Sequence, residues 1–182
     1  MKKLLLFVVL TTFLAVGSAS AGSYMGMFKN TTSHDGSEDS RVTVEPNEVY
    51  HVYLMVNADW DEGFKDWEMK MVKNSDDVLL STTYVDTGAW KIGSPFDYEG
   101  WAVVNPNSCW YGWNHVCTLE MMYAGGGAHT IEMMPWNLEQ FPVNTNCANE
   151  EVPLSIIGDF GVNMDVVGTN ESSWGAVKSM YK

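Results

Sequence analysis

Apolar and polar residues alternate along most of this chain, and this period of two constrains its fold more than any other feature. In 49–57 the alternation places Tyr50, Val52, Leu54 and Val56 on one face of an extended segment. Successive side chains of a β-strand point to opposite faces of the sheet, so such a segment buries one face and exposes the other. The same pattern predicts strands at 24–29, 41–45, 64–72, 78–85, 98–105 and 129–134, and a last pair near 154–157 and 160–167.

Turn-forming residues separate these segments, among them Pro46-Asn47, Asp61-Glu62-Gly63 and Gly125-Gly126-Gly127. Short alternating strands divided by frequent turns are typical of antiparallel sandwiches. Helical periodicity is missing until the final residues of the chain. The sequence therefore predicts an all-β domain over 22–167, an antiparallel jelly-roll or immunoglobulin-like sandwich of about 8–9 strands.

The first 21 residues have the pattern of a secretory signal peptide. Lys2 and Lys3 begin it, an apolar stretch follows over 4–16, and Ala19-Ser20-Ala21 supplies small residues for cleavage. The apolar stretch is too short for a retained transmembrane helix. We expect cleavage after Ala21, no transmembrane segment, and a mature protein that is secreted or held at the cell surface.

The chain is strongly acidic, with 10 Lys+Arg, 23 Asp+Glu and a formal net charge of −13. The leader carries two lysines and no acid, so its removal changes the net charge from −13 to −15. Such a surface repels phosphate backbones and anionic lipid headgroups. Nucleic acid and membrane surfaces are therefore disfavoured as partners.

Three cysteines remain in a chain that we expect to be exported. In 115–123 the alternation places Cys117 with Leu119 and Met121 on a face that we expect to be core, whereas Cys109 and Cys147 lie in Asn- and Pro-rich loop segments. We expect a Cys109–Cys147 disulfide, with Cys117 a buried free thiol. A Cys109–Cys117 bridge across a short turn is the alternative.

The stretch "VTVEPNEVYHVYLMVNADWDEGFKDWEMKMVKNSDDVLL" resembles the opening of a cohesin module. In that family a strand, a turn and a strand ending in Asn lead to a Gly-Phe pair, a further alternating strand, and an acidic turn before Val-Leu. These features correspond here to 42–45, Pro46-Asn47, 49–57, Gly63-Phe64, 67–71 and 76–79. The later stretch "VCTLEMMYAGGGAHTIEMM" is similar to a strand, glycine turn and strand of the same family.

This resemblance implies a jelly-roll-like sandwich, related in architecture to carbohydrate-binding modules, with a binding role. It does not extend to "NPNSCWYGWNH" at 105–115, which departs from the family pattern. It also does not identify dockerins, the usual partners of cohesins, as partners of this chain.

Catalytic motifs are missing from the sequence. Its histidines, His34, His51, His115 and His129, are scattered without ligand spacing, and there is no nucleophile elbow, phosphate loop or dinucleotide fingerprint. We therefore expect no enzymatic activity and no cofactor. A small glycan-active hydrolase that uses two carboxylates is the less favoured alternative.

Asp59, Asp61 and Glu62 are oxygen ligands in one turn and form a calcium candidate. The EF-hand spacing is not met, because Gly63 comes one position early and Lys70 occupies the place of the bidentate glutamate. We expect these acids to form a solvated hairpin tip.

Aromatic residues in the middle of the chain are the candidate ligand-binding residues: Trp90, Trp110, Tyr111 and Trp113. Loop aromatics on a rigid sandwich present stacking faces to sugars or to protein partners. The alternative is that these rings fill the ends of the sandwich and cover the disulfide.

The final segment, 168–182, reads as a linker followed by a short amphipathic helix. Trp174, Val177 and Tyr181 recur at helical spacing, and Lys178 lies near the C-terminus, where it suits the helix dipole. The ending resembles a recurrent SWGxVK-type C-terminus of exported bacterial proteins, which implies a sorting or attachment tag. A helix that folds back onto the acidic domain is the alternative.

These observations predict an exported, cohesin-like binding or adhesion module that engages a protein or glycan partner at the cell surface through loop aromatics. An extracellular structural or assembly subunit, which polymerises through an edge strand or the tail, is the second candidate. The sequence leaves the oligomeric state open.

Overall fold

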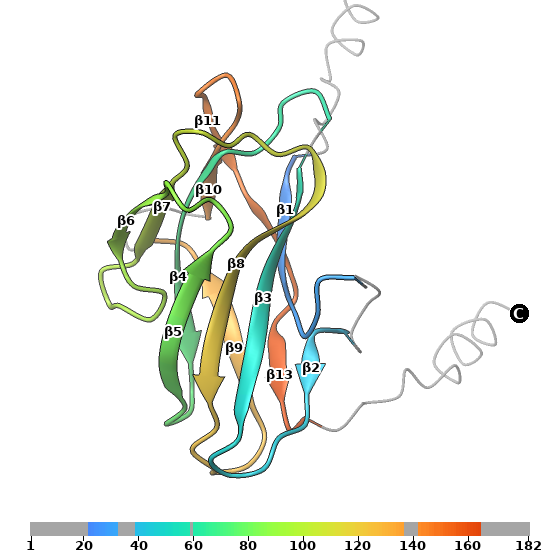
Figure 1. The fold of residues 1–182 in the computed structure, drawn as a ribbon, viewed down its shortest axis with the longest axis vertical. Helices are drawn as coiled ribbons and strands as arrows, with labels where there is room; N and C mark the ends of the chain where they lie inside the picture. The colour runs from blue at the N-terminus through green and yellow to red at the C-terminus, as the bar shows by residue number, and fades with distance from the viewer. Residues whose placement is uncertain (1–21, 33–38, 59, 137–141, 165–182) are drawn as a thin grey trace, which may run out of the picture.

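Two packed β-sheets form the part of the chain that this computed structural model describes, residues 22–32, 39–58, 60–136 and 142–164 (Figure 1). The predicted fold class, an all-β sandwich, is confirmed for the described residues. The predicted signal peptide (1–21) and the predicted linker and C-terminal helix (168–182) lie outside the described residues. Over the described ranges, the structure contains no helix of the length and apolar character needed to cross a bilayer.

The five-stranded sheet has the order β12-β1-β3-β8-β5 and lies toward the viewer in Figure 1. Its long central strands, β3 and β8, pair antiparallel with one register shift beside Leu54. Both strands alternate buried and accessible residues, as the period of two predicts. The strands are β1 (Tyr24–Phe28), β3 (Val49–Ala58), β5 (Val78–Tyr84), β8 (Gly112–Met122) and β12 (Ser155–Ile157).

The second sheet has eight strands in the order β11-β10-β4-β9-β13-β2, with β7 paired to β4 and β6 paired to β7. Its strands are β2 (Arg41–Val42), β4 (Asp66–Lys73), β6 (Trp90–Gly93), β7 (Trp101–Val104), β9 (His129–Met134), β10 (Val143–Thr145), β11 (Glu151–Pro153) and β13 (Phe160–Val162).

The predicted purely antiparallel arrangement is wrong at two pairs of strands. β1 runs parallel to β12, and β13 runs parallel to β2. The last three strands pass from the eight-stranded sheet to the five-stranded sheet and back, which brings late strands beside early ones in the same direction. The described residues also contain thirteen strands rather than the predicted eight or nine. The strands that the sequence pattern missed, β6, β10 and β11, have only three or four residues each, too few to show a period.

β9 and β10 lie along the same edge of β4 as two parts of one interrupted strand. Met134 pairs with Lys70 and Val143 pairs with Glu68, and both strands run antiparallel to β4. The opposite edge of β4 pairs with β7 and, at Met71, donates its N–H to the carbonyl of Pro95 at 2.7 Å. β9 therefore ends at Met134, and β10 begins at Val143 along the same edge of β4.

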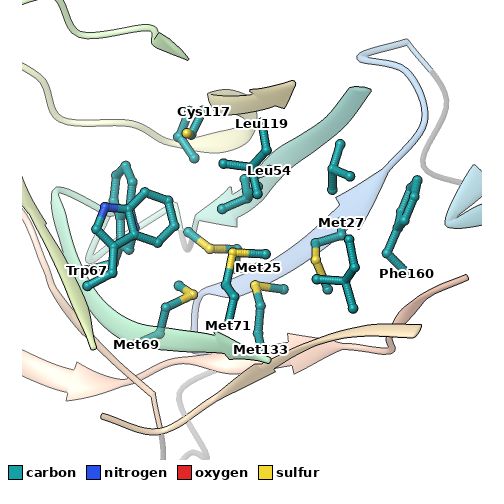
Figure 2. Packing of buried hydrophobic residues seen from close by; sticks show 14 of the residues in the cluster. Met25, Met27, Leu54, Trp67, Met69, Met71, Cys117, Leu119, Met133 and Phe160 are labelled. Atoms are coloured by element: carbon teal, nitrogen blue, oxygen red, sulfur yellow. The ribbon is translucent and has the colours of Figure 1, made fainter. Parts of the chain in front are cut away.

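The core between the sheets is rich in methionine and tryptophan (Figure 2). Trp67 and Trp101 meet edge to face with ring centroids 5.9 Å apart, and Trp101 donates its indole N–H to the Tyr84 hydroxyl at 3.0 Å. Unbranched thioether side chains adapt to irregular gaps, which suits the space around two large indoles. The methionines of the core cluster are Met25, Met27, Met69, Met71, Met121 and Met133.

Candidate functional site

Exposed apolar side chains gather on the outer face of the hairpin formed by β6 and β7. Lys91 pairs with Val103, whose side chain is buried in the sandwich together with that of Trp67. Because strand residues alternate between faces, Trp90 and Ile92 point outward. They are 71% and 63% exposed, values that a strand residue facing a core does not reach.

The loop 94–100 between β6 and β7 extends this apolar area. Tyr98 is 86% exposed and lies between two shallow hollows. One hollow, of about 290 Å³, is lined by Ile92, Tyr98 and Trp136, with Asp97 and Glu99 among the other lining residues. The second, of about 330 Å³, continues along β4 and is lined by Lys70, Met71, Val72, Lys73, Phe96, Asp97 and Tyr98.

Trp136, two residues after the end of β9, lies against Gly100 in the same area. The φ of Gly100, +99°, lies in the left-handed region that glycine adopts readily. A Cβ at this position would lie 2.8 Å from the indole of Trp136, so a side chain here would displace that ring. We refer to Trp90, Ile92, Tyr98 and Trp136 as the β6–β7 surface.

Two lysines of β4 border the β6–β7 surface although the chain is acidic, because Lys70 and Lys73 line the second hollow together with Tyr98. Lys91 alternates with Trp90 and Ile92 along β6 and points the other way. The Nζ atom of Lys91 lies 4.4 Å from the ring centroid of Tyr84, and that of Lys73 lies 5.8 Å from the ring centroid of Phe96. Cation–π contacts of this kind hold ammonium groups against aromatic rings. The area therefore combines apolar anchors with both signs of charge.

The four aromatic residues predicted as ligand-binding do not form one platform. Trp90 belongs to the β6–β7 surface, whereas Trp110, Tyr111 and Trp113 lie at or just before the start of β8. Trp113 pairs with Asn57, which pairs with Tyr24, and so lies on the outer face of the five-stranded sheet. Trp90 is on the outer face of the other sheet.

The three aromatic residues before and within β8 each pack against a neighbour. Trp110 is half-buried, exchanges two backbone hydrogen bonds of 2.9 Å with Phe64, and packs on the core. The ring of Tyr111 lies over Gly63. The ring of Trp113 meets Phe28 edge to face, with centroids 6.0 Å apart.

A disulfide joins Cys109 to Cys147, the pairing expected from their loop positions. It ties the connection between β7 and β8 to the turn between β10 and β11. Cys117 is a buried free thiol in the core cluster. Burial raises the pKa of this thiol to about 12, and the charge of Lys91 acts in the opposite direction.

The predicted calcium residues are only partly described, because Asp59 lies outside the described residues. Asp61 is exposed, and the carbonyl of Glu62 accepts the N–H of Cys147 at 3.0 Å. Across the described ranges, no group of three His, Cys, Asp or Glu side chains is arranged to hold a metal ion.

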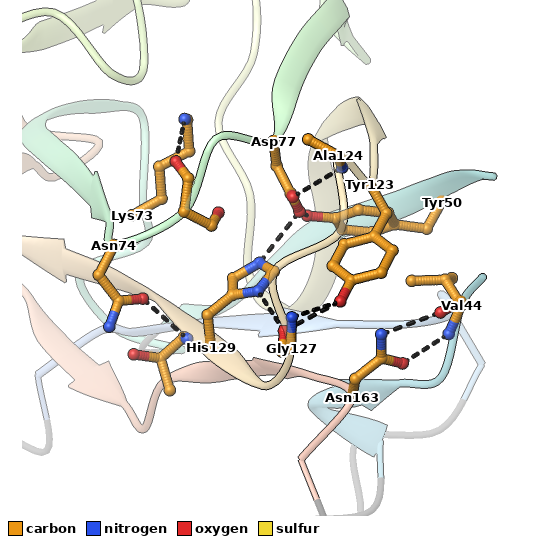
Figure 3. Close-up of polar contacts among 12 residues, drawn as sticks. Val44, Tyr50, Lys73, Asn74, Asp77, Tyr123, Ala124, Gly127, His129 and Asn163 are labelled. Carbon is orange, nitrogen blue, oxygen red and sulfur yellow. Dashed lines mark hydrogen bonds and ion pairs between the residues drawn. The ribbon is translucent and has the colours of Figure 1, made fainter. Parts of the chain in front are cut away.

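A buried polar cluster lies at the start of β5, at the end of this strand that is far from the β6–β7 hairpin (Figures 1 and 3). Asp77 accepts hydrogen bonds from the Tyr50 hydroxyl at 2.6 Å and from the N–H of Ala124 at 3.1 Å. His129 Nε2 lies 3.0 Å from the same carboxylate, an ion-pair distance without hydrogen-bond alignment. Burial, and then the hydrogen bond to Asp77, raise the pKa of Tyr50 well above its ordinary value.

This Asp77 cluster ties turns together. Tyr123 stacks on His129 with ring planes 16° apart and exchanges two hydrogen bonds with the backbone of Gly127. The cluster thereby joins β3, the turn before β5 and the hairpin between β8 and β9. The Asp77 carboxylate contacts the Tyr50 hydroxyl, the Ala124 N–H and His129 Nε2. These contacts hold segments of the sandwich together.

Sequence reasoning missed most of the β6–β7 surface. Tyr98 was assigned to a strand over 98–105, but the strand begins at Trp101 and Tyr98 lies in a turn. Pro95 and Gly100 bracket that turn and are the signal that marks it. Trp136 lies two residues after the end of β9, at a position for which the sequence carries no periodic signal.

No family model matches the sequence, and no curated protein matches it. Solved structures do match the fold. A cohesin module from a family 33 glycoside hydrolase of Clostridium perfringens has a TM-score of 0.56 and 7% sequence identity, over 78% of this chain and 97% of that module.

Two further cohesins extend the comparison across bacteria and archaea. A type I cohesin of Clostridium thermocellum, solved in a cohesin–dockerin complex, has a TM-score of 0.55 and 10% identity, over 78% of this chain and 97% of its own. A non-cellulosomal cohesin of the archaeon Archaeoglobus fulgidus has a TM-score of 0.51 and 11% identity, over 85% of this chain and 98% of that cohesin. At these identities the likeness concerns architecture, and this chain has a cohesin-like fold.

Proposed function

We propose that the mature chain is a non-catalytic protein-binding module whose partner contacts the β6–β7 surface. The observation that carries this proposal is the exposure of Trp90, Ile92 and Tyr98, at 71%, 63% and 86%, on one side of one hairpin. Clusters of exposed apolar side chains on a soluble protein mark interaction sites. Trp and Tyr are also the residue types that most often dominate binding energy.

The composition of the surface favours a protein partner. Tyr98 and Trp136 line a hollow that accepts an apolar side chain, and Asp97 and Glu99 border it. Lys70 and Lys73 line the adjoining hollow and offer charge to an acidic rim. One of the cohesin neighbours was solved with a dockerin, so exported proteins that carry dockerin-like segments are the first partners to test.

The proposed setting is outside the cytoplasm. Cleavage after Ala21 releases the sandwich, and the tail around Trp174, Val177, Lys178 and Tyr181 serves sorting, attachment or docking to the domain. The role there is adhesion or assembly. A second contact area, separate from the β6–β7 surface, is still predicted at Trp110, Tyr111 and Trp113.

Alanine substitutions measured by titration calorimetry test the proposal. The probe is a partner captured by cross-linking from the exported proteins of the source cell and then purified. Trp90→Ala and Tyr98→Ala should each weaken its binding by about tenfold or more, because each removes a large apolar anchor. Trp60→Ala is the matched control, because Trp60 is 77% exposed and lies in the turn between β3 and β4.

Binding that survives both substitutions, or that depends equally on Trp60, contradicts this assignment. Melting temperatures of all three variants serve as the folding control. Since these side chains are exposed, the variants should melt close to the parent protein.

A further inference from the structure

The outer face of the five-stranded sheet carries almost no charge, although the chain has a formal net charge of −13. The five strands of this sheet contain a single Asp, Glu, Lys or Arg residue, Glu120, whose carboxylate accepts a hydrogen bond from the Ser81 hydroxyl at 2.7 Å. In the other sheet, β4 alone contains four such residues among eight. The face with little charge is turned toward the viewer in Figure 1.

Aromatic side chains lie on this face in place of charged ones. Tyr24, Asn57 and Trp113 are register partners on β1, β3 and β8. Their side chains point outward, because strand residues alternate and the adjacent Met25 and Val56 are buried. Tyr24 is 39% and Trp113 is 40% exposed. With one strand between them, their Cα atoms are about 10 Å apart.

Further rings continue the face along β3 and β8. Tyr53 meets His115 edge to face with centroids 5.5 Å apart, and the ring of His51 lies 6.1 Å from that of Tyr53. The ring of Phe28 lies over Gly26 and fills the space between the outward rings, so that Phe28 is buried on an outer face. Burial lowers the pKa of His115, so this ring adds no charge at neutral pH.

We propose that this face binds an uncharged polysaccharide through the outer-sheet aromatic strip, which we define as Tyr24, His51, Tyr53, Trp113 and His115. Sugar rings present C–H faces that stack on aromatic rings, and hydroxyls around their edges that need hydrogen-bond partners. The phenol groups of the two tyrosines and the amide of Asn57 both donate and accept hydrogen bonds. A disaccharide unit of an extended chain spans the distance from Tyr24 to Trp113.

Charge selects an uncharged glycan as the occupant. A second copy of this acidic chain is repelled, and so is an anionic polymer or lipid surface. A basic protein finds one carboxylate on these strands, that of Glu120, which already accepts the Ser81 hydroxyl. The hollows that suit a protein side chain flank Tyr98, on the other sheet. An uncharged, hydroxyl-rich chain meets no repulsion on the strip and needs no ion pair.

Affinity electrophoresis of residues 22–182 in native gels tests the inference. The probes are soluble neutral polysaccharides (hydroxyethyl cellulose, mixed-linkage β-glucan and galactomannan), with polygalacturonate as the anionic comparison. We expect at least one neutral polysaccharide to retard the protein and polygalacturonate to leave its mobility unchanged. Trp113→Ala and Tyr24→Ala should each weaken binding by about tenfold, because each removes one stacking ring. Trp113→Phe should retain most of the affinity, since a ring remains.

Trp90→Ala is the matched control, because Trp90 is 71% exposed but belongs to the other sheet, and it should bind the polysaccharide like the parent protein. Melting temperatures separate lost binding from lost folding, and Tyr24→Ala, at the start of β1, reports on binding if Trp113→Ala unfolds. Mobility that no neutral polysaccharide changes overturns the inference. So does retardation by polygalacturonate alone, or binding that Tyr24→Ala leaves intact and Trp90→Ala removes. The partner test at Trp90 and Tyr98 is independent of each of these outcomes.

Discussion

At the scale of single residues, the buried carboxylate of Asp77 has the most consequence for stability. Its side chain is fully buried, and three groups from separate parts of the chain converge on it. Removing a partner from such a cluster leaves buried polar groups without full compensation. The sequence did not predict this role, because "NSDD" is typical of a solvated turn.

Asp77→Asn should lower the free energy of unfolding by about 2–3 kcal/mol, since it weakens the contacts to Tyr50 and His129 while it keeps the side-chain volume. Denaturant unfolding followed by tryptophan fluorescence measures the change. The adjacent Asp76→Asn is the control, because Asp76 is exposed. Equal stability of the two variants would show that the cluster contributes little.

Cys117 is the second residue whose environment has a measurable consequence, and its burial was predictable from strand alternation. With its pKa raised to about 12, the folded thiol stays protonated where an exposed cysteine ionises. Only the thiolate is the nucleophile in thiol exchange. We expect a thiol reagent at mildly alkaline pH to leave native protein unmodified and to label one thiol after unfolding. Rapid labelling of native protein would contradict the buried position.

The same shift links stability to pH. Unfolded Cys117 ionises near pH 8.5 and the folded residue near pH 12, so above about pH 9 unfolding releases a proton. The free energy of unfolding therefore falls as pH rises across this window. Cys117→Ala should show a shallower decline between about pH 8.5 and pH 10 in denaturant titrations. Identical slopes for the two proteins would exclude this contribution.

At the scale of elements, sequence reasoning succeeded where strands are long and failed where they are short. β3, β4 and β8 each show a period of two that places apolar residues inward. β6 carries the sequence WKIG with all four residues exposed, so no inward pattern marks it. The contact between Gly100 and Trp136 joins segments that are distant in the sequence, so no local signal encodes it.

The disulfide links two such elements, the connection before β8 and the turn after β10. It closes 38 residues of chain, which in the chain-entropy model corresponds to about 4 kcal/mol of stability. Replacing both Cys109 and Cys147 with Ala should lower the free energy of unfolding by up to that amount. Reductant should lower the melting temperature of the parent protein and leave the double variant unchanged. If reductant leaves the melting temperature of the parent protein unchanged, the disulfide does not contribute this stability.

At the scale of the whole molecule, the two sheets present outer faces of different character. The eight-stranded sheet carries the β6–β7 surface, with Lys70 and Lys73 beside it, and the five-stranded sheet carries Trp113 on its outer face. The alternation and the resemblance to cohesins predicted the class of fold despite identities near one in ten. Strand direction and the gathering of Trp90, Tyr98 and Trp136 depend on chain crossings that alternation does not encode.

Hydrogen exchange of the mature chain with and without its purified partner tests the central claim most directly. The account predicts slower exchange on binding in β6, in the loop 94–100 and in the neighbouring part of β4, because the partner covers the β6–β7 surface. Exchange around Trp60 and Trp113 should stay unchanged. Protection confined to the start of β8, or its absence from β6 and the loop, would contradict the proposal that this surface binds the partner.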